Sequence, residues 1–109
     1  MISRHVIIDF DVVGFHYYPD PPKEVDFLKY NHRHLFQIKC NWLVGHNERE
    51  KEIFIYTDKV KEWLENEFGL PCDFKNMSCE SIAEKILNKF DCYSVSVLED
   101  GKGGAKLER

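Results

Sequence analysis

The chain has 109 residues, of which 43% are hydrophobic and 14% aromatic, so it predicts one folded domain over residues 1–109 and excludes global disorder. The net charge of −4 argues against a general nucleic-acid binder, because such a protein needs a basic face. The sequence has no apolar run long enough for a membrane span, no export signal and no Cys-x-x-Cys pair. We therefore expect a cytoplasmic protein with reduced thiols and no membrane partner.

The first half of the chain predicts strands. Residues 5–16 are rich in β-branched and aromatic side chains and predict a first strand, with Gly14 at a bulge. After a proline-containing loop, residues 35–44 alternate between apolar and polar side chains, which predicts a second strand with one buried face. A charged turn at 45–51 leads to the short apolar segment 53–56, which we expect to be the antiparallel partner of the second strand.

The second half predicts two helices and a final hairpin. Thr57 is expected to cap a first helix, which ends at Gly69, and Ser78 is expected to cap a second helix with an apolar stripe. Residues 93–97 alternate and predict a strand, and a glycine-rich turn leads to a short last strand near 105–107. The order β-β-β-α-α-β-β predicts an α+β fold, with a four-stranded antiparallel sheet that carries both helices on one face.

Three histidines carry the clearest chemical signal. His32 and His34 are one residue apart, so in a strand both imidazoles point to the same face. His16 ends the first strand and can reach the pair if the two strands are neighbours. Three neutral imidazoles with an open fourth position form the arrangement of a catalytic zinc site. The alternative is that these are ordinary surface or core histidines.

Five short motifs follow one another over residues 5–108. They are Val12-Val13-Gly14-Phe15-His16, His32-Arg33-His34-Leu35-Phe36, Tyr56-Thr57-Asp58-Lys59-Val60-Lys61, Met77-Ser78-Cys79-Glu80-Ser81-Ile82-Ala83 and Val95-Ser96-Val97-Leu98-Glu99. In this order they resemble the F-x-A-x-H, H-G-H-aromatic, D-F-x-x-L-K, P-T-x-E-x-x-A and V-x-V-x-E motifs of the 6-pyruvoyl-tetrahydropterin synthase and 6-carboxy-tetrahydropterin synthase family. These are the pterin enzymes of the tunnelling fold.

The resemblance implies that the three histidines hold zinc, which acts as a Lewis acid on oxygen atoms of a substrate side chain. It implies that Glu99 accepts hydrogen bonds from a pterin ring and that Ser78 also contacts the substrate. Asp100, the next residue, is expected to point to the opposite side of the strand. The resemblance further implies a homo-oligomer whose sheets join edge to edge, with ligand sites between subunits.

The chain departs from the family at its catalytic groups. The family has a cysteine shortly before H-x-H and an Asp-His pair after the first helix, and this chain has neither. The catalytic residues are therefore unassigned. Asp26 and Tyr30 lie nearest the missing cysteine, and Cys72 and Asp73 lie nearest the missing pair. Each of these four is more simply interpreted as a solvated loop residue.

Three functions stay open at this point. The first is a zinc-dependent enzyme, a carbon–oxygen lyase of the pterin-synthase type, that acts on a pterin or a purine-derived small molecule. The second is a non-catalytic module of the same fold, which binds a pterin-like or nucleotide-like ligand without turning it over. The third is a structural protein that uses its sheet edges for assembly. The missing base favours binding, and the three ordered histidines favour metal chemistry.

Overall fold

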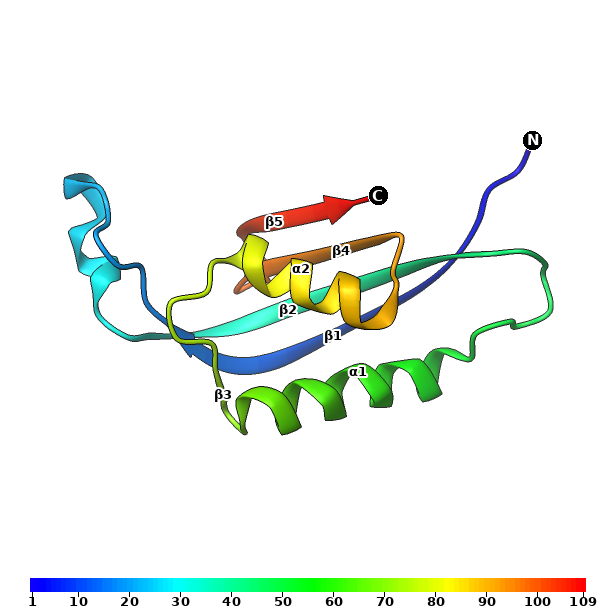
Figure 1. Ribbon diagram of the computed structural model, residues 1–109, viewed down its shortest axis with the longest axis horizontal. Coiled ribbons are helices and arrows are strands. Elements are labelled where there is room, and N and C mark those ends of the chain that lie inside the picture. Colours follow the sequence, from blue (N-terminus) through cyan, green and yellow to red (C-terminus); the bar gives the residue numbers. More distant parts are fainter.

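The computed structural model describes residues 1–109 as an α+β fold with two helices on one face of a five-stranded sheet (Figure 1). The strands are β1 (Arg4–His16), β2 (His32–Val44), β3 (Cys72–Asp73), β4 (Ser94–Glu99) and β5 (Gly103–Glu108). The helices are α1 (Ile53–Phe68), α2 (Cys79–Phe90) and a short 3₁₀ segment, η1 (Lys23–Lys29). The strand order is β3-β1-β2-β4-β5, and only the β1–β3 pair is parallel. The α+β class is thus confirmed, with a mixed sheet of five strands instead of four antiparallel ones.

β1 and β2 form a long antiparallel ribbon. Their pairing runs without interruption from Arg4 and Val44 at one end to His16 and His32 at the other. Gly14 is therefore not at a bulge. It is a glycine for a different reason, since a Cβ atom there would lie 2.7 Å from a ring carbon of Phe74, which closes the core at this point.

The segment 53–56 is the first turn of α1 and not a strand. Glu52, and not Thr57, caps this helix, because the Glu52 carboxylate accepts hydrogen bonds from two backbone N–H groups of the first turn. Tyr56 lies one helical turn before the buried Val60 and packs against the core. The helical spacing therefore prevails over the β propensity of the segment, whose other side chains are exposed.

The other predicted ends of the helices agree with the structure. α1 ends at Gly69, which has a φ of 94°, and Ser78 caps α2 by accepting a hydrogen bond from the Ser81 N–H at 3.1 Å. In the predicted apolar stripe of α2, Phe90 is half-buried, and the other four residues are buried, namely Ile82, Ala83, Ile86 and Leu87. A tight turn at Asp100 and Gly101, both with positive φ, then joins β4 to β5.

The core fills the space between the sheet and the two helices. Its largest side chain is that of Trp42, whose Nε1–H donates to the Phe90 carbonyl oxygen at 2.9 Å. All four cysteines are buried, and none forms a disulfide. Neither α-helix combines the length and the apolar character that crossing a bilayer requires.

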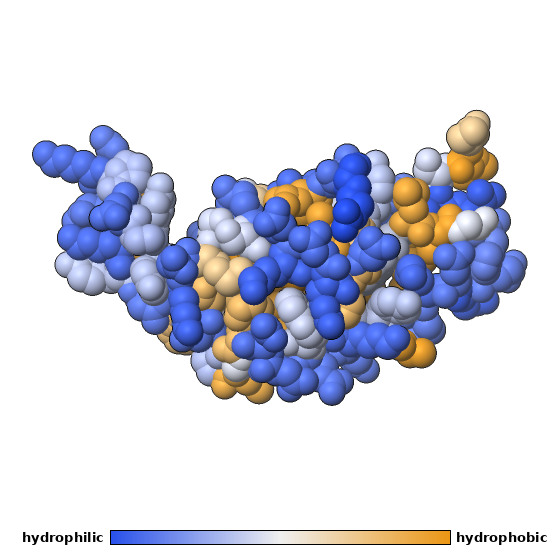
Figure 2. All heavy atoms as spheres, viewed as in Figure 1, coloured by the Kyte–Doolittle hydropathy of each residue, from blue (hydrophilic) through white to orange (hydrophobic).

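The loop between β1 and β2 extends away from this core. It carries η1, none of whose residues is buried (Figure 1). Figure 2 shows this loop as a hydrophilic projection that stands apart from the body of the molecule. Where the projection joins the body, β1 ends and β2 begins, and the three histidines lie at this junction.

Candidate metal centre

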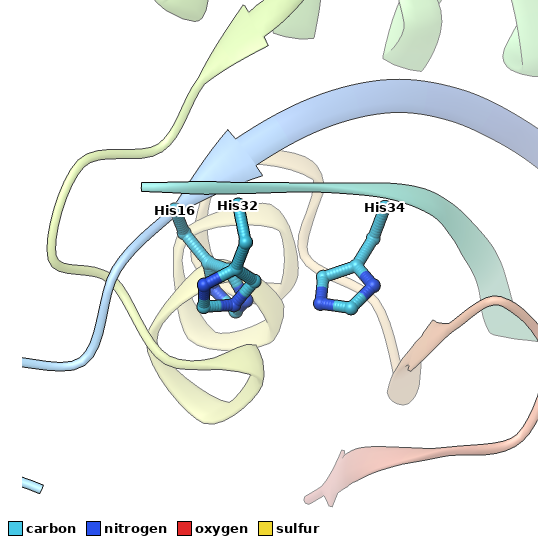
Figure 3. A group of neighbouring side chains, drawn as sticks. All are labelled: His16, His32 and His34. Atoms are coloured by element: carbon cyan, nitrogen blue, oxygen red, sulfur yellow. The ribbon is translucent and has the colours of Figure 1, made fainter. Parts of the chain in front are cut away.

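The structure brings His16, His32 and His34 together at the end of the β1–β2 ribbon (Figure 3). His16 and His32 are paired across the ribbon, and His34 lies two residues further along β2, so all three rings lie on the same face. One nitrogen from each ring can be chosen so that the three nitrogens lie within 4.8 Å of one another. The predicted convergence of the three histidines is therefore confirmed.

Backbone carbonyl groups fix the orientation of two of these rings. The Nδ1 of His16 lies 2.9 Å from the Met77 carbonyl oxygen, and the Nδ1 of His32 lies 2.8 Å from the Tyr30 carbonyl oxygen. Because a carbonyl oxygen can only accept a hydrogen bond, each Nδ1 carries the ring proton. In the neutral ring, Nε2 then presents the lone pair, and this is the form in which imidazole binds a metal ion.

A carboxylate fixes the third ring. The Nδ1 of His34 donates to Asp100 Oδ2 at 2.7 Å, and Asp100 Oδ1 accepts the backbone N–H of Leu35 at 2.9 Å. The Leu35 N–H and then His34 hold the pKa of Asp100 below its usual range. The expectation that Asp100 points away from the site is therefore wrong. The strand ends at Glu99, and the left-handed backbone of Asp100 (φ 55°) turns its side chain towards His34.

Two of the three Nε2 atoms have no hydrogen-bond partner. The Nε2 atoms of His16 and His34 are both buried and unpartnered, and the His16 residue is only 6% exposed. Burial is the largest cause that lowers the pKa of His16, so its imidazole is held in the neutral form. Buried polar atoms without partners are costly, and a bound cation would satisfy both lone pairs. The centre has the donors, the tautomers and the burial of a metal site.

Glu99 lies at the same centre. Its Oε2 is 2.9 Å from His16 Nε2, and its Oε1 is 3.4 Å from His34 Nε2. The Cys79 thiol donates a hydrogen bond to Glu99 Oε2 at 3.6 Å. Burial, followed by the charge of Glu99, raises the pKa of Cys79 to about 12, so the thiol is protonated at neutral pH.

A cavity of about 660 Å³ opens directly over the histidines. This volume suits a small organic ligand. Ser78 and Glu99 both line the cavity, together with the three histidines. The Ser78 hydroxyl group is already engaged, since its oxygen accepts the Ser81 N–H and its proton is directed to Ser81 Oγ at 3.1 Å.

The four candidate bases near the missing family motifs lie outside this cavity. Asp26 pairs with a lysine of η1, and the Tyr30 side chain is 65% exposed. Cys72 is fully buried beside α1, and Asp73 accepts a backbone N–H of its own loop. Two further titratable groups lie at the centre, neither of which the sequence predicts as a site residue. Asp100 contacts His34, and Cys79 contacts Glu99.

Comparison with protein-family models and with curated proteins gives no match to this chain.

Proposed function

We propose that the protein is a zinc-dependent enzyme of the 6-pyruvoyl/6-carboxy-tetrahydropterin synthase type that acts on a pterin or a purine-derived small molecule. One observation carries the proposal. Three imidazoles bring one nitrogen each within 4.8 Å of one another, and each ring has its Nδ1 held by an acceptor, on the wall of a cavity of small-molecule size. The order of the family-like motifs along the chain supports the same assignment.

Zinc is the metal that the donor set suits best. Three neutral imidazoles with a fourth position facing a cavity are typical of catalytic zinc sites, whereas harder ions such as Mg²⁺ prefer oxygen donors. When bound, zinc would polarise an oxygen atom of the substrate as a Lewis acid. The residues of the chain would then position the substrate around that oxygen.

The lining of the cavity suits a flat heterocycle with N–H donors. Glu99 offers a carboxylate, the natural partner for the paired N–H groups of a pterin or guanine edge. Tyr17 and Tyr18 lie at the rim, where an aromatic ring can stack on a flat ligand. Ser78 lines the cavity at the start of α2, close to the Glu99 side. These contacts would hold the ring while its side chain reaches the metal.

A non-catalytic binding module is the second candidate, and one observation favours it. None of the four candidate bases lines the cavity, and the raised pKa of about 12 keeps the nearby Cys79 thiol protonated. Proton transfer next to a carbonyl requires a base that works near neutral pH. A protein with this centre can therefore bind the ligand without turning it over.

We also propose a homo-oligomer. β5 pairs with β4 alone, and β1 pairs on its outer side only through Gly14 and Phe15, so both edges of the sheet offer free backbone groups. Joining β5 of one copy to β1 of the next would continue the sheet in antiparallel order. Light scattering should give a mass well above the 12.9 kDa of one chain, and a monomer at micromolar concentration would contradict this assembly.

Metal analysis tests the proposed function. Protein purified after zinc-replete expression should carry about one zinc atom per chain, and His32→Ala should lose most of it. His46→Ala is the matched control, because His46 is an exposed histidine at the far end of the ribbon. Mass spectrometry of co-purified small molecules should then identify a pterin-like or purine-like compound. Wild-type protein without stoichiometric metal would contradict the proposal.

A further inference from the structure

The backbone register places Glu99 over the histidines. Glu99 is the last residue of β4 and is paired with Phe36 of β2, two residues from His34 on the same face. The Asp100 N–H donates to the Leu35 carbonyl oxygen at 2.8 Å, which fastens the end of β4 to β2. The carboxylate of Glu99 is thus held at the centre by the sheet itself.

One of the two distances from Glu99 to the histidines is that of neighbouring ligands on one metal ion, and the other is shorter. With metal–ligand bonds of about 2.0–2.1 Å, adjacent ligand atoms of a tetrahedral site lie roughly 3.3–3.4 Å apart. Glu99 Oε1 lies 3.4 Å from His34 Nε2, and Glu99 Oε2 lies 2.9 Å from His16 Nε2. The distance to His34 fits two ligands of one ion, and the shorter distance to His16 would have to lengthen slightly when the ion binds.

A hydrogen-bonded ion pair does not account for these contacts. Both Nε2 atoms remain without a hydrogen-bond partner although Glu99 is close, so an N–H at either position would not point at the carboxylate. Both rings already donate through Nδ1, to Met77 and Asp100. An Nε2 lone pair has the same direction as that N–H would have, so it points beside the carboxylate, where a cation would contact the nitrogen and the carboxylate together.

We infer that Glu99 is the fourth ligand of the metal in the ligand-free protein, so that side chains from β1, β2 and β4 close the site until an incoming molecule displaces the carboxylate. This inference rests on the metal centre of the proposed function. It adds a resting state in which the Glu99 carboxylate blocks the coordination position that a ligand would take. Cys79 is a positioning residue, because its thiol donates to Glu99 Oε2 and is itself only 6% exposed.

Glu99 can also leave the metal. A third of its side chain (33%) is exposed, and it lines the cavity through which a ligand would enter. A heterocycle with N–H donors would take over the carboxylate through charge-assisted hydrogen bonds. An oxygen atom of the same molecule would then occupy the freed coordination position. The metal would thus open only to molecules that carry both kinds of group.

The experiment uses the metal alone. Wild-type protein, Glu99→Gln and Glu80→Gln are loaded with Co²⁺, and their visible spectra are recorded from about pH 6 to pH 9, the range in which a metal-bound water titrates. Zinc affinity is measured by competition with a chromophoric chelator. Glu80 is the matched control, since it is a carboxylate that lines the same cavity but pairs with no histidine.

The wild-type spectrum should be that of a tetrahedral site and should not change with pH. Glu99→Gln should bind zinc roughly tenfold to a hundredfold more weakly and should show a spectral transition near pH 7, because water takes the fourth position. Glu99→Asp, which keeps the charge but withdraws the carboxylate, should show the same transition. Glu80→Gln should match the wild type in both measurements.

Two results would overturn the fourth-ligand role and leave the three-histidine centre intact. One is an unchanged zinc affinity and spectrum in Glu99→Gln, and the other is a wild-type spectrum that already titrates near pH 7. Failure of the wild-type protein to bind Co²⁺ or Zn²⁺ would overturn this role and the proposed function together. The zinc content of His32→Ala separates these cases.

Discussion

The face of β1 and β2 that lies under the helices carries two different kinds of side chain along its length. From Phe36 to Trp42, every second residue of β2 is apolar and almost completely buried against α1 and α2. At His32 and His34 the same alternation places imidazoles, which are half-buried and face the cavity. The strand, its period and its face are the same in both regions. The side chains differ, and so does what covers them, which is α1 and α2 in the first region and the cavity in the second.

The border between the two regions is Phe36. Its ring lies edge-on to His16 and His34, with centroid distances of 5.1 and 5.6 Å, and edge-on to Phe74 of the core at 5.0 Å. The apolar region therefore holds the rings of the metal centre from one side, and the Nδ1 acceptors hold them from the other. A rigid core next to the ligands is what preorganises a metal site.

Removing a side chain far inside the apolar region should have the largest effect and should affect stability alone. Trp42→Ala should lower the free energy of unfolding by about 3–5 kcal/mol, because it leaves a large cavity and removes the hydrogen bond to the Phe90 carbonyl oxygen. Zinc affinity of the folded protein should stay within about threefold of wild type, as expected for distant and independent sites. Urea unfolding and chelator competition measure the two quantities.

Trp42→Phe should retain a larger part of the stability than Trp42→Ala, because the ring still fills most of the space. A tenfold loss of zinc affinity in folded Trp42→Ala would show that the two regions of the face are coupled along the whole strand.

Local patterns predict much of this face from the sequence. The period of two places His32, His34 and the apolar side chains of β2 on one side, because successive side chains of a strand point to opposite faces. His16 joins the pair because β1 and β2 are antiparallel neighbours, a condition that the sequence alone does not settle. The cap of α2 at Ser78 and the end of α1 at Gly69 depend only on nearby residues, and both predictions are confirmed.

The features that the sequence does not predict depend on distant contacts or on breaks in a pattern. Cys79 reaches Glu99 only because α2 packs on β4, a contact that spans 20 residues. Asp100 breaks the alternation, since the strand ends one residue before it. The prediction of a strand at 53–56 is wrong. The β-branched residues of this segment favour a strand, and they hide the helical spacing between Tyr56 and the buried Val60.

A substitution at the border should affect both regions moderately. Gly14 is paired with His34, and a Cβ atom there would lie 2.7 Å from a ring carbon of Phe74 and 3.1 Å from one of Phe36. Gly14→Ala should therefore lower the free energy of unfolding by about 1–3 kcal/mol, the usual cost of overpacking. It should also weaken zinc binding, because the displaced Phe36 ring contacts two ligands.

Gly103→Ala is the control for this substitution. Gly103 is also a strand glycine, but nothing lies within 4 Å of the place where its Cβ would stand. The free energy of unfolding of Gly103→Ala should stay within about 0.5 kcal/mol of wild type. Equal unfolding temperatures of Gly14→Ala and wild type would show that the core side chains can move aside at this point. The core would then not be what holds the histidines in place.

The smallest expected effect concerns the acceptor that orients one ring of the metal centre. Asp100 uses one oxygen for the Leu35 N–H and the other for His34 Nδ1, and an asparagine has only one oxygen to offer. Asp100→Asn must therefore give up one of these two bonds, and zinc affinity should fall by roughly tenfold, as is typical for a carboxylate behind a histidine ligand. Asp91→Asn is the matched control, because Asp91 has the same left-handed backbone (φ 52°) but lies at the far end of α2. Asparagine tolerates this conformation, so a loss seen only at position 100 reports on the lost bond and not on the backbone. Equal zinc affinity in Asp100→Asn and wild type would mean that the contact with the Phe36 ring is enough to orient His34.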